Sequence, residues 1–486
     1  MTTRPSPRQT AVVIGGSMAG LLAARILSEH FRRVTIAERD RLPEEPEQRK
    51  GVPQGRHAHG LLASGFDILK QLFPGIRDEL VADGGMCHDL GDCFRWYHHG
   101  VYKTHVKAGM EAIFCSRPLL ERRVRARVLA LPNVVVRETT EVAHLLSTDD
   151  RTRVTGVVLR LLGDDGPREQ AATASLVVDS TGRGSRSGAW LEALGYARPP
   201  ESAVRMAMGY STRFFRRRPG DVTDAAAVMV APTAPHDKRI GVLFPVEGDR
   251  WICTLGGWHG DFAPTDDAGY LEFARSLAKP DVYDVIKDAE PVSEVVVHRI
   301  PTNLRRHYDR MRRVPAGYLV LGDAVCSFNP IFGQGMTSAA MQALVLRSLL
   351  DRCEVERDLA EVSRPYFRGA ARAVDTAWQV ATGEDFRYPE TEGKRPAALP
   401  FINAYVKQVQ RACSRDPEVL RAFLQVMNLV KAPPSVMAPR VAWRVARAVW
   451  AMARQERDDA STSRNASSSR SIRRAYQLHQ QRNPTA

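Results

Sequence analysis

The sequence predicts an α/β protein that is organised around a dinucleotide-binding βαβ unit at its N-terminus. Three stretches lead to this prediction, because in each of them an apolar strand runs into glycine and an acidic residue; they span 10–38, 174–186 and 318–337. Ligands of open α/β sheets bind at the carboxyl ends of the strands, so three such strand ends can form one site. We expect the rest of the chain to supply a second sheet and a helical region.

The first unit consists of a strand, a tight turn, a helix and a second strand. The apolar run 12–14 ends in two glycines, a helix-compatible segment follows over 17–30, and another apolar run over 34–37 stops at Glu38. A glycine turn alone would be weak evidence. The two flanking strands and the acidic residue favour dinucleotide binding over a merely structural turn.

Each small residue of this turn suits the binding of a pyrophosphate. Gly15 and Gly16 permit the tight turn, and Gly20 lets the helix pack closely against the strand. Ser17 stands where a glycine is usual, but it is small enough to let a phosphate approach the backbone. The helix N-terminus faces the phosphates, and Glu38 is placed to accept hydrogen bonds from ribose hydroxyls.

Composition disfavours several classes of protein. The 486 residues, of which 44% are hydrophobic, suffice for two or three interleaved domains. No apolar run is long enough to cross a bilayer, and the N-terminus lacks the apolar core of a signal peptide, so we expect a cytoplasmic protein. The seven cysteines are scattered without a Cys-x-x-Cys pair, which favours reduced thiols and no metal site. The net charge is +14, but the arginines are spread along the chain, so we expect no nucleic-acid partner.

The loop over 49–60 is rich in glycine, proline and basic residues that could reach phosphates or a ring system. It contains Arg56, His57 and His59. The two histidines lack an apparent third ligand, so we do not expect a metal site. The aromatic segment 84–112 resembles a strand pair that borders a pocket, although core packing is the more common fate of such residues.

A helix is predicted to begin at Ser116, whose side chain can cap the first turn, and Arg117 would project from that terminus. Further strands are predicted nearby, at 134–137, 156–161 and 174–178. The last of these ends in Asp179 and a glycine loop that reaches Arg186. This loop is a second feature suited to the edge of a dinucleotide site.

The third feature is an apolar strand that begins at Tyr318 and leads to Asp323, whose carboxylate can accept hydrogen bonds from polyol hydroxyls. Pro330 stiffens the next loop, and Gly333 and Gly335 let backbone approach a flat ring. A helix is predicted to follow. Its N-terminus would stabilise negative charge that develops on that ring.

Together these motifs resemble the FAD-dependent monooxygenases of the aromatic hydroxylase and squalene epoxidase superfamily. The resemblance is carried by Gly-Gly-Ser-Met-Ala-Gly at 15–20, Glu38, the loop 179–186, Gly-Asp-Ala at 322–324 and Pro-Ile-Phe-Gly-Gln-Gly at 330–335. In the loops 49–59 and 179–186 the chain is most similar to bacterial enzymes that epoxidise polyketide polyenes on the way to polyether antibiotics. The resemblance implies a Rossmann-like FAD-binding domain of glutathione-reductase type, an interleaved β-sheet substrate domain and a C-terminal helical region.

The resemblance also implies which residues hold FAD. The pyrophosphate would lie on the first turn, the adenosine ribose on Glu38, the ribityl chain on Asp323, and the isoalloxazine along the loop from Pro330. No side chain is assigned as a catalytic acid or base. The complete set of expected cofactor contacts is Gly15, Gly16, Ser17, Gly20, Glu38, Arg39, Arg56, Arg117, Asp323, Pro330, Gly333, Gly335, Met336 and Thr337.

The expected domains interleave along the chain. Segments 8–200 and 301–370 would form the FAD domain, 201–300 the substrate domain and 371–457 the helical region, with a disordered tail over 458–486. Alternation along one strand places several apolar side chains on one face, and a hairpin adds another. The candidates for the substrate pocket are Met206, Met208, Tyr210 and Phe244. Such a face implies a large hydrophobic substrate, although core packing is as frequent a role.

A helix over 441–453 carries arginines near one face. It could touch an anionic membrane peripherally, but a helix that covers a core with its arginines in water is the more common case.

The implied reaction uses O2, activated as a C4a-hydroperoxyflavin, to place one oxygen atom in a large hydrophobic secondary metabolite. We expect epoxidation of a polyketide or terpenoid alkene, and hydroxylation of a polycyclic phenol is the alternative. NADPH or NADH would supply electrons directly or through a separate flavin reductase. A flavin-dependent halogenase is less favoured, because no Trp-x-Trp-x-Ile-Pro pattern and no convincing active-site lysine are found. A non-catalytic flavin-binding protein would have no reason to keep the ring-facing loop.

Overall fold

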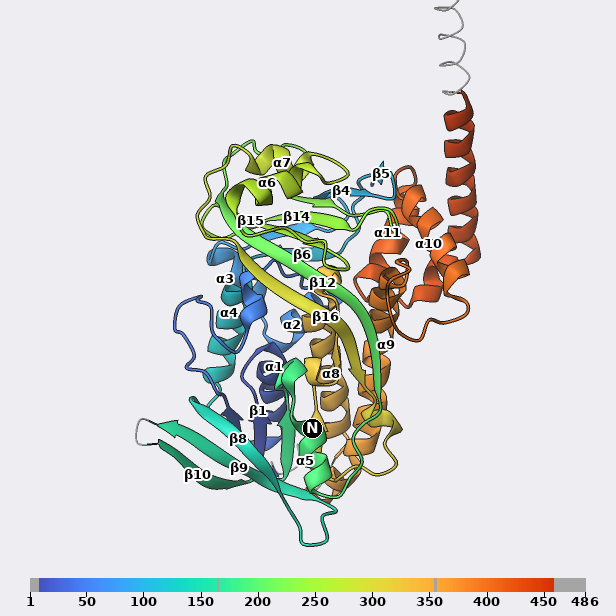
Figure 1. Ribbon diagram of the computed structural model, residues 1–486. Helices are drawn as coiled ribbons and strands as arrows, with labels where there is room; N and C mark the ends of the chain where they lie inside the picture. Colours follow the sequence, from blue (N-terminus) through green and yellow to red (C-terminus); the bar gives the residue numbers. More distant parts are fainter. Residues whose placement is uncertain (1–7, 164–165, 354–355, 459–486) are drawn as a thin grey trace, which may run out of the picture.

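Two sheets dominate the part of the chain that the structure describes, residues 8–163, 166–353 and 356–458 of a computed structural model (Figure 1). The first sheet is parallel and has five strands in the order β17–β11–β1–β2–β7. Its strands come from distant parts of the chain: β1 (Arg8–Ile14), β2 (Phe31–Ala37), β7 (Val134–Arg137), β11 (Leu176–Asp179) and β17 (Tyr318–Val320). This arrangement confirms the predicted parallel α/β domain.

Both faces of this sheet are covered, because every residue of β11 and β17 is buried. Helices α1, α4 and α9 contact the sheet, and α8 packs against α1 and α9. A three-stranded antiparallel sheet contacts β2 and β11. The covering elements are α1 (Met18–Leu27), α4 (Arg117–Leu129), α5 (Ser187–Ala193), α8 (Gln334–Leu350), α9 (Ser363–Asp385), β8 (Thr140–Ser147), β9 (Val154–Gly163) and β10 (Gly166–Thr173). The Ser116 hydroxyl accepts a hydrogen bond from Leu119 N at 3.2 Å, which confirms the predicted cap of α4.

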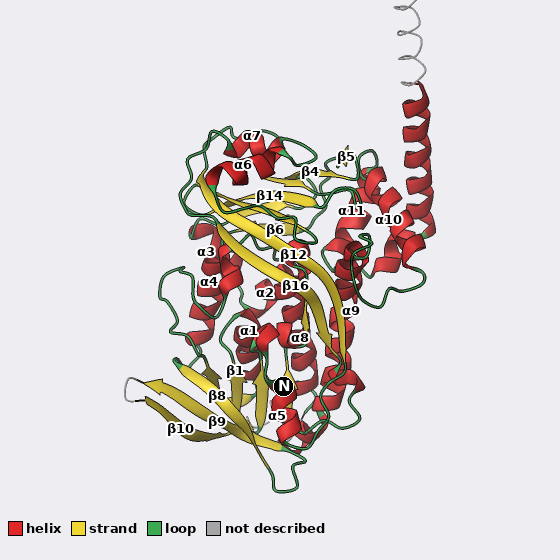
Figure 2. Cartoon of the chain, in the orientation of Figure 1, coloured by secondary structure: helices red, strands yellow, loops and turns green. Residues whose placement is uncertain are grey.

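The second sheet has eight strands in the order β18–β16–β12–β15–β14–β13–β4–β5. Its longest strands, β12 (Glu201–Arg216) and β16 (Val296–Arg306), run across the molecule (Figure 2). One face is packed by α6 (Asp267–Arg275) and α7 (Asp281–Ile286), leaving the other face for the first domain. The remaining strands are β4 (Phe94–His98), β5 (Val101–Tyr102), β13 (Ala227–Val230), β14 (Arg239–Val246), β15 (Arg250–Gly257) and β18 (Cys326–Ser327).

The second sheet draws on segments outside the predicted range 201–300. Strand β4 pairs in parallel with β13, and β5 pairs with β4, so residues 94–98 and 101–102 belong to this sheet although they precede β7, β11 and β17 of the first sheet in the sequence. Sequence alternation within β4 indicates a strand but carries no signal for its distant partner, which explains the difference. The connecting elements are α2 (Ala63–Leu72), α3 (Ile76–Ala82), β3 (Met86–Asp89) and β6 (Glu111–Phe114).

The C-terminal part is helical, as expected. It comprises α10 (Leu399–Ala412), α11 (Pro417–Met427) and a last helix over 439–458. The predicted tail lies outside the described residues except for Asp458, which is the last described residue of that helix. Among the described helices, none has the length and apolar character that crossing a membrane requires.

Candidate functional site

The turn between β1 and α1 requires its glycines. Gly15 has a φ of +96°, and a Cβ there would lie 2.9 Å from the Ser180 carbonyl oxygen. A Cβ at Gly20 would lie 1.8 Å from the Gly15 carbonyl oxygen, which no side chain tolerates. Gly16 N donates to Glu38 Oε2 at 2.7 Å, so the turn and the acidic end of β2 are joined. The structure therefore brings four of the predicted cofactor residues together at the N-terminus of α1.

Arg117 lies at this same point. Its Nη2 donates to Ser17 Oγ at 3.1 Å, and Ser17 Oγ donates to Glu121 Oε2 at 2.9 Å. A second guanidinium, that of Arg49, joins the group: its Nε donates to Glu121 Oε1 at 2.9 Å, and its Nη1 lies 3.2 Å from Glu38 Oε2. Sequence analysis missed Arg49 and Glu121, although the basic character of the loop over 49–60 was a signal for the first.

Two buried nitrogen atoms of this cluster have no hydrogen-bond partner among the described residues. They are Arg49 Nη2 and Arg117 Nη1. Buried guanidinium nitrogens are almost always paired, so both atoms indicate a missing anion. A pyrophosphate at the N-terminus of α1 fits this requirement, because the helix dipole favours the same negative charge. The residues present therefore fit the diphosphate part of FAD.

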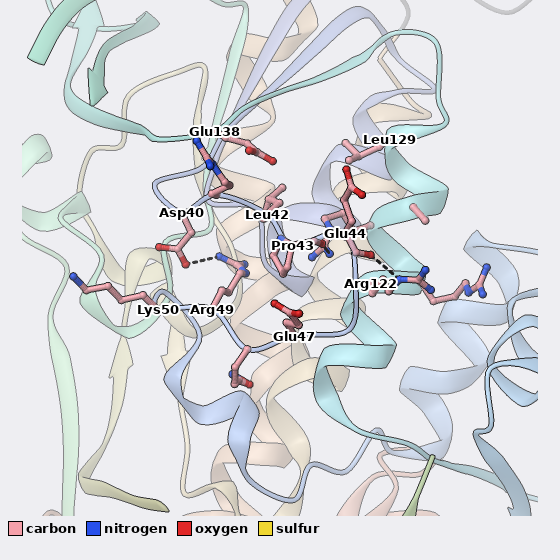
Figure 3. A pocket seen from close by; sticks show the side chains of 15 residues that line it. Asp40, Leu42, Pro43, Glu44, Glu47, Arg49, Lys50, Arg122, Leu129 and Glu138 are labelled. Carbon is pink, nitrogen blue, oxygen red and sulfur yellow. Dashed lines mark hydrogen bonds and ion pairs between the residues drawn. The ribbon is translucent and has the colours of Figure 1, made fainter. Parts of the chain in front are cut away.

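A cleft of about 980 Å³ opens between the loop after β2 and helix α4, with Glu138 at one side of it (Figure 3). Asp40 and Arg49 line it from the loop, and Arg122 and Arg125 line it from α4. The cleft lies at the carboxyl ends of β2 and β7, where a parallel sheet of this kind binds nucleosides. Arg39, predicted to contact the cofactor, has a side chain that is 59% exposed and does not line this cleft.

Asp323 follows β17, in the middle of the short helical turn Gly322–Ala324. Burial raises the pKa of its carboxyl group to about 6, and the positive charges of Arg183 and Arg117 oppose that rise. A Cβ on Gly335 would lie 3.6 Å from Asp323 Oδ1, so the carboxylate is next to the first turn of α8. The positive charge of Arg117, which is hydrogen-bonded to the first turn, thus also acts on the Asp323 carboxyl group.

The predicted flavin-facing loop meets the loop that contains the histidines. Gly333 has a φ of +61°, and a Cβ there would lie 2.9 Å from Gly60 Cα. Thr337 Oγ1 accepts a hydrogen bond from Leu62 N at 3.1 Å. Met336 instead packs against the large hydrophobic core of the first domain. The backbone of 330–335 therefore has a defined position between α8 and the 49–60 loop.

A buried carboxylate that sequence analysis missed holds this loop from behind. This carboxylate belongs to Asp385, at the end of α9. Its Oδ1 accepts hydrogen bonds from Asn329 Nδ2 at 2.9 Å and from Trp258 Nε1 at 2.7 Å. Its Oδ2 accepts one from Asn303 Nδ2 at 2.5 Å. Asn329, Asn303 and Asp385 are all fully buried. Asn329 directly precedes Pro330, so this network fixes the start of the flavin-facing loop.

His57 connects the loop over 49–60 to the second sheet. Its Nδ1 lies 2.8 Å from Thr212 Oγ1, and Thr212 Oγ1 lies 2.7 Å from Thr254 Oγ1. Burial, with smaller contributions from nearby His298, His59 and Arg56, lowers the pKa of His57 to about 3. The imidazole is therefore neutral at physiological pH.

Other titratable groups surround His57. Its ring centroid lies 4.6 Å from that of Tyr210 and 5.7 Å from that of His298, and burial lowers the pKa of His298 as well. Burial and the charge of Arg117 lower the pKa of His59 to about 4. The predicted contact Arg56 is exposed. Within the described ranges, no group of three or more His, Cys, Asp and Glu side chains is arranged to hold a metal ion.

The predicted substrate residues fall into three places. Met206 and Met208 are fully buried in one apolar cluster that includes Ile331 of the flavin-facing loop. Tyr210 lies beside His57, and Phe244 packs with Phe94 and Phe114 at ring-centroid distances of 5.8 and 5.7 Å. A bulge between Arg205 and Met208 interrupts the regular alternation of β12. The structure thus packs Met206 and Met208 with the flavin-facing loop, places Tyr210 beside His57 of the 49–60 loop, and places Phe244 in a separate aromatic group.

Comparisons with known proteins agree with this geometry. The model of the FAD binding domain family matches residues 8–361. The chain belongs to this family. It is similar to protein Rv3254 of Mycobacterium tuberculosis, with 34% identity over 447 residues that cover 87% of this chain and 90% of that protein. The family assignment identifies FAD as the cofactor, and the unpaired guanidinium nitrogens fit its diphosphate.

Solved structures show the same fold at low identity. PqsL, described as a probable FAD-dependent monooxygenase from Pseudomonas aeruginosa, aligns with a TM-score of 0.56 and 19% identity over 78% of this chain and 98% of its own. The flavin-dependent brominase Bmp2 aligns with a TM-score of 0.63 and 12% identity, over 92% of this chain and 99% of its own. The shared fold is therefore that of monooxygenases and halogenases that use flavin.

Proposed function

We propose that this flavoprotein is a monooxygenase that inserts one oxygen atom from O2 into a large hydrophobic substrate. The observation that carries the proposal is the contact between the flavin-facing loop and the second sheet, where Ile331 packs in one cluster with Met206 and Met208. A ring held along that loop would face apolar side chains of the sheet. Such a surface suits a hydrophobic substrate and excludes water from the reacting atoms.

The chain's own residues bind and orient. Gly16, Arg49 and Arg117 would hold the diphosphate, Glu38 the ribose, and Asp323 the ribityl hydroxyls. The chemistry that bound FAD supplies is the activation of O2 and the transfer of one oxygen atom. Asn329, held by its hydrogen bond to Asp385, keeps the loop in place against the second sheet. Electrons would come from NADPH or NADH, either directly or through a separate flavin reductase.

We further propose epoxidation of an alkene in a polyketide or terpenoid as the reaction, within secondary metabolism. Oxygen transfer to an alkene needs no base on the protein, and the two histidines nearest Tyr210 both have lowered pKa values. A base with a pKa of about 3 is far too weak to ionise a phenol, whose pKa is about 10. The resemblance of the 49–59 and 179–186 loops to polyene epoxidases supports the same choice.

Hydroxylation of a polycyclic phenol is the second candidate. It is favoured by the polar side chains His57, His298 and Tyr210, which could bind a phenolic hydroxyl by hydrogen bonds without ionising it. A halogenase is less favoured, because the sequence lacks the Trp-x-Trp-x-Ile-Pro pattern and an active-site lysine near the first motif.

The deciding experiment supplies enzyme, a reducing system and 18O2 with a polyene and, separately, with a polycyclic phenol. Mass spectrometry then locates the label. One labelled oxygen in an epoxide supports epoxidation. A labelled hydroxyl on the phenol ring, with the polyene unchanged, supports aromatic hydroxylation instead. Release of peroxide alone with every substrate would contradict monooxygenase activity.

A further inference from the structure

The last described helix, residues 439–458, presents an unusual outward face. Every third or fourth residue along this face is arginine or tryptophan, and all six side chains are exposed. Spacings of three and four residues keep side chains on one side of an α-helix. We call this face the Arg–Trp stripe; it consists of Arg440, Trp443, Arg447, Trp450, Arg454 and Arg457.

The opposite face fixes the helix on the protein. Val445 and Ala448 are buried in a cluster with Val419 and Phe423 of α11. Arg444 Nη1 lies 2.9 Å from Asp416 Oδ2, and Arg411 Nη2 of α10 lies 2.7 Å from Glu456 Oε1. The packing leaves the Arg–Trp stripe on the outer side of the helix, although Arg447 Nη2 also lies 3.6 Å from Asp416 Oδ2. Its exposure therefore follows from how the helix is anchored.

Each tryptophan of the stripe is paired with the arginine one turn later. The guanidinium carbon of Arg447 lies 4.9 Å from the ring centroid of Trp443, and that of Arg454 lies 5.7 Å from the ring centroid of Trp450. The two rings are 61% and 65% exposed. Over 439–458 the sequence has five arginines against two acidic residues, so the helix carries excess positive charge.

Exposed apolar side chains continue the surface at the start of this helix. Met437 precedes it and is 58% exposed, while Phe401 and Ile402 at the start of α10 are 80% and 47% exposed. These segments are adjacent, because the Tyr405 hydroxyl, one turn after Phe401, donates to the Val436 carbonyl oxygen at 2.8 Å. Figure 1 shows α10 beside the last helix, whose far end extends beyond the rest of the protein.

We propose that the Arg–Trp stripe docks the protein on the surface of a bilayer that contains anionic phospholipid. Tryptophan rings partition into the interface between headgroups and acyl chains, and arginines bind lipid phosphates. The aliphatic and aromatic side chains of Met437, Ile402 and Phe401 would enter the same apolar layer. Docking there would bring the enzyme to the phase in which a hydrophobic substrate concentrates.

Two other partners fit the same observations less well. A second copy of the chain would place its own arginines against this surface, and the like charges would repel. A single-stranded nucleic acid could use the arginines and stack on the tryptophans, but it offers nothing apolar to Met437 or Ile402. Charge and apolar character together favour the lipid surface.

The test measures co-sedimentation of the FAD-loaded full chain with vesicles of phosphatidylcholine alone and of phosphatidylcholine with phosphatidylglycerol. We expect binding to the anionic vesicles that weakens with added salt, and little binding to the neutral ones. Arg440→Glu with Arg454→Glu removes charge, and Trp443→Ala with Trp450→Ala removes the rings. Each pair should lower the apparent affinity by on the order of tenfold or more.

A matched control reverses two arginines elsewhere. Arg198 and Arg275 are 63% and 62% exposed, so Arg198→Glu with Arg275→Glu changes the net charge equally and should leave vesicle binding near the wild-type level. FAD content and the unfolding midpoint, measured for all variants, show that each is folded. Wild-type binding by the stripe variants, or no retention on anionic vesicles, overturns the proposal. So does a dimer that the Trp443→Ala/Trp450→Ala pair dissociates, or tighter binding to a single-stranded oligonucleotide that the stripe variants abolish.

Discussion

Asp385 Oδ1 accepts a hydrogen bond from Asn329 Nδ2 at 2.9 Å, which ties the end of helix α9 to the residue before Pro330. The two residues are 56 positions apart in the sequence and belong to different predicted domains. Asp385 also accepts from Asn303 of β16 and from Trp258 after β15. The C-terminal helical region, the second sheet and the loop that begins at Pro330 therefore share one buried carboxylate.

Replacement of Asp385 should affect both the stability of the fold and the position of the loop that begins at Pro330. Asp385→Ala leaves three buried donors unpaired and should lower the free energy of unfolding by about 3 kcal/mol or more. Asp385→Asn keeps one acceptor oxygen for Trp258 and Asn329, but its amide NH2 would face the NH2 donor of Asn303. We therefore expect the free energy of unfolding to fall by about 1–2 kcal/mol. Denaturant unfolding measures both values. Both variants should also alter the visible spectrum of bound flavin; an unchanged spectrum in Asp385→Ala would contradict its role in positioning the loop.

The same carboxyl group predicts how stability depends on pH. Burial raises the pKa of Asp385 to about 6, although its three hydrogen-bond donors oppose that rise, whereas the unfolded value is 3.8. The folded state therefore binds more protons than the unfolded state between pH 4 and 6. The contribution of the Asp385 carboxyl group to stability falls as the pH rises through that window.

The expected size of this effect is about 2–3 kcal/mol for the Asp385 carboxyl group alone. The measurement compares the free energy of unfolding at several pH values between 4 and 7 in wild-type protein and in Asp385→Asn. The difference between the two proteins should change across this window and become constant above about pH 7. A difference that does not vary with pH would show that Asp385 titrates normally.

The local parts of the cofactor site could be predicted from sequence, because they depend on neighbouring residues. The turn at Gly15 and Gly20 follows from steric limits on the backbone. The cap at Ser116 follows from a hydroxyl that accepts a hydrogen bond from the backbone N–H three residues later. Arg49 and Asp385 could not be assigned in this way. Their partners lie tens of residues away, so the fold alone brings them to Glu121 and Asn329.

Arg117 should be a main determinant of FAD affinity. Its Nη1 is a buried, charged donor next to the first turn without a partner among the described residues, so Arg117→Ala would remove the charge-assisted hydrogen bond that we propose to the diphosphate. We expect FAD to bind roughly 10- to 100-fold more weakly. Titration of apoprotein with FAD, followed by flavin fluorescence, gives the affinity. Arg33→Ala, at an exposed arginine of β2, is the matched control; equal affinities of the two variants would contradict the assignment of Arg117.

The pH dependence of oxygen transfer tests the assignment of His57 as a neutral, structural imidazole. Because its pKa lies near 3, no ionisation of His57 should appear in the rate of product formation between pH 6 and 9. His57→Asn should keep the contact to Thr212 through its side-chain amide and retain activity on the proposed alkene substrate. Thr212→Val should lower that activity, because it removes the hydroxyl that contacts His57 of the 49–60 loop. Product per turnover is measured by mass spectrometry for all three proteins. A step between pH 6 and 8 that disappears in His57→Asn would make His57 a base, and the substrate would then be a phenol rather than an alkene.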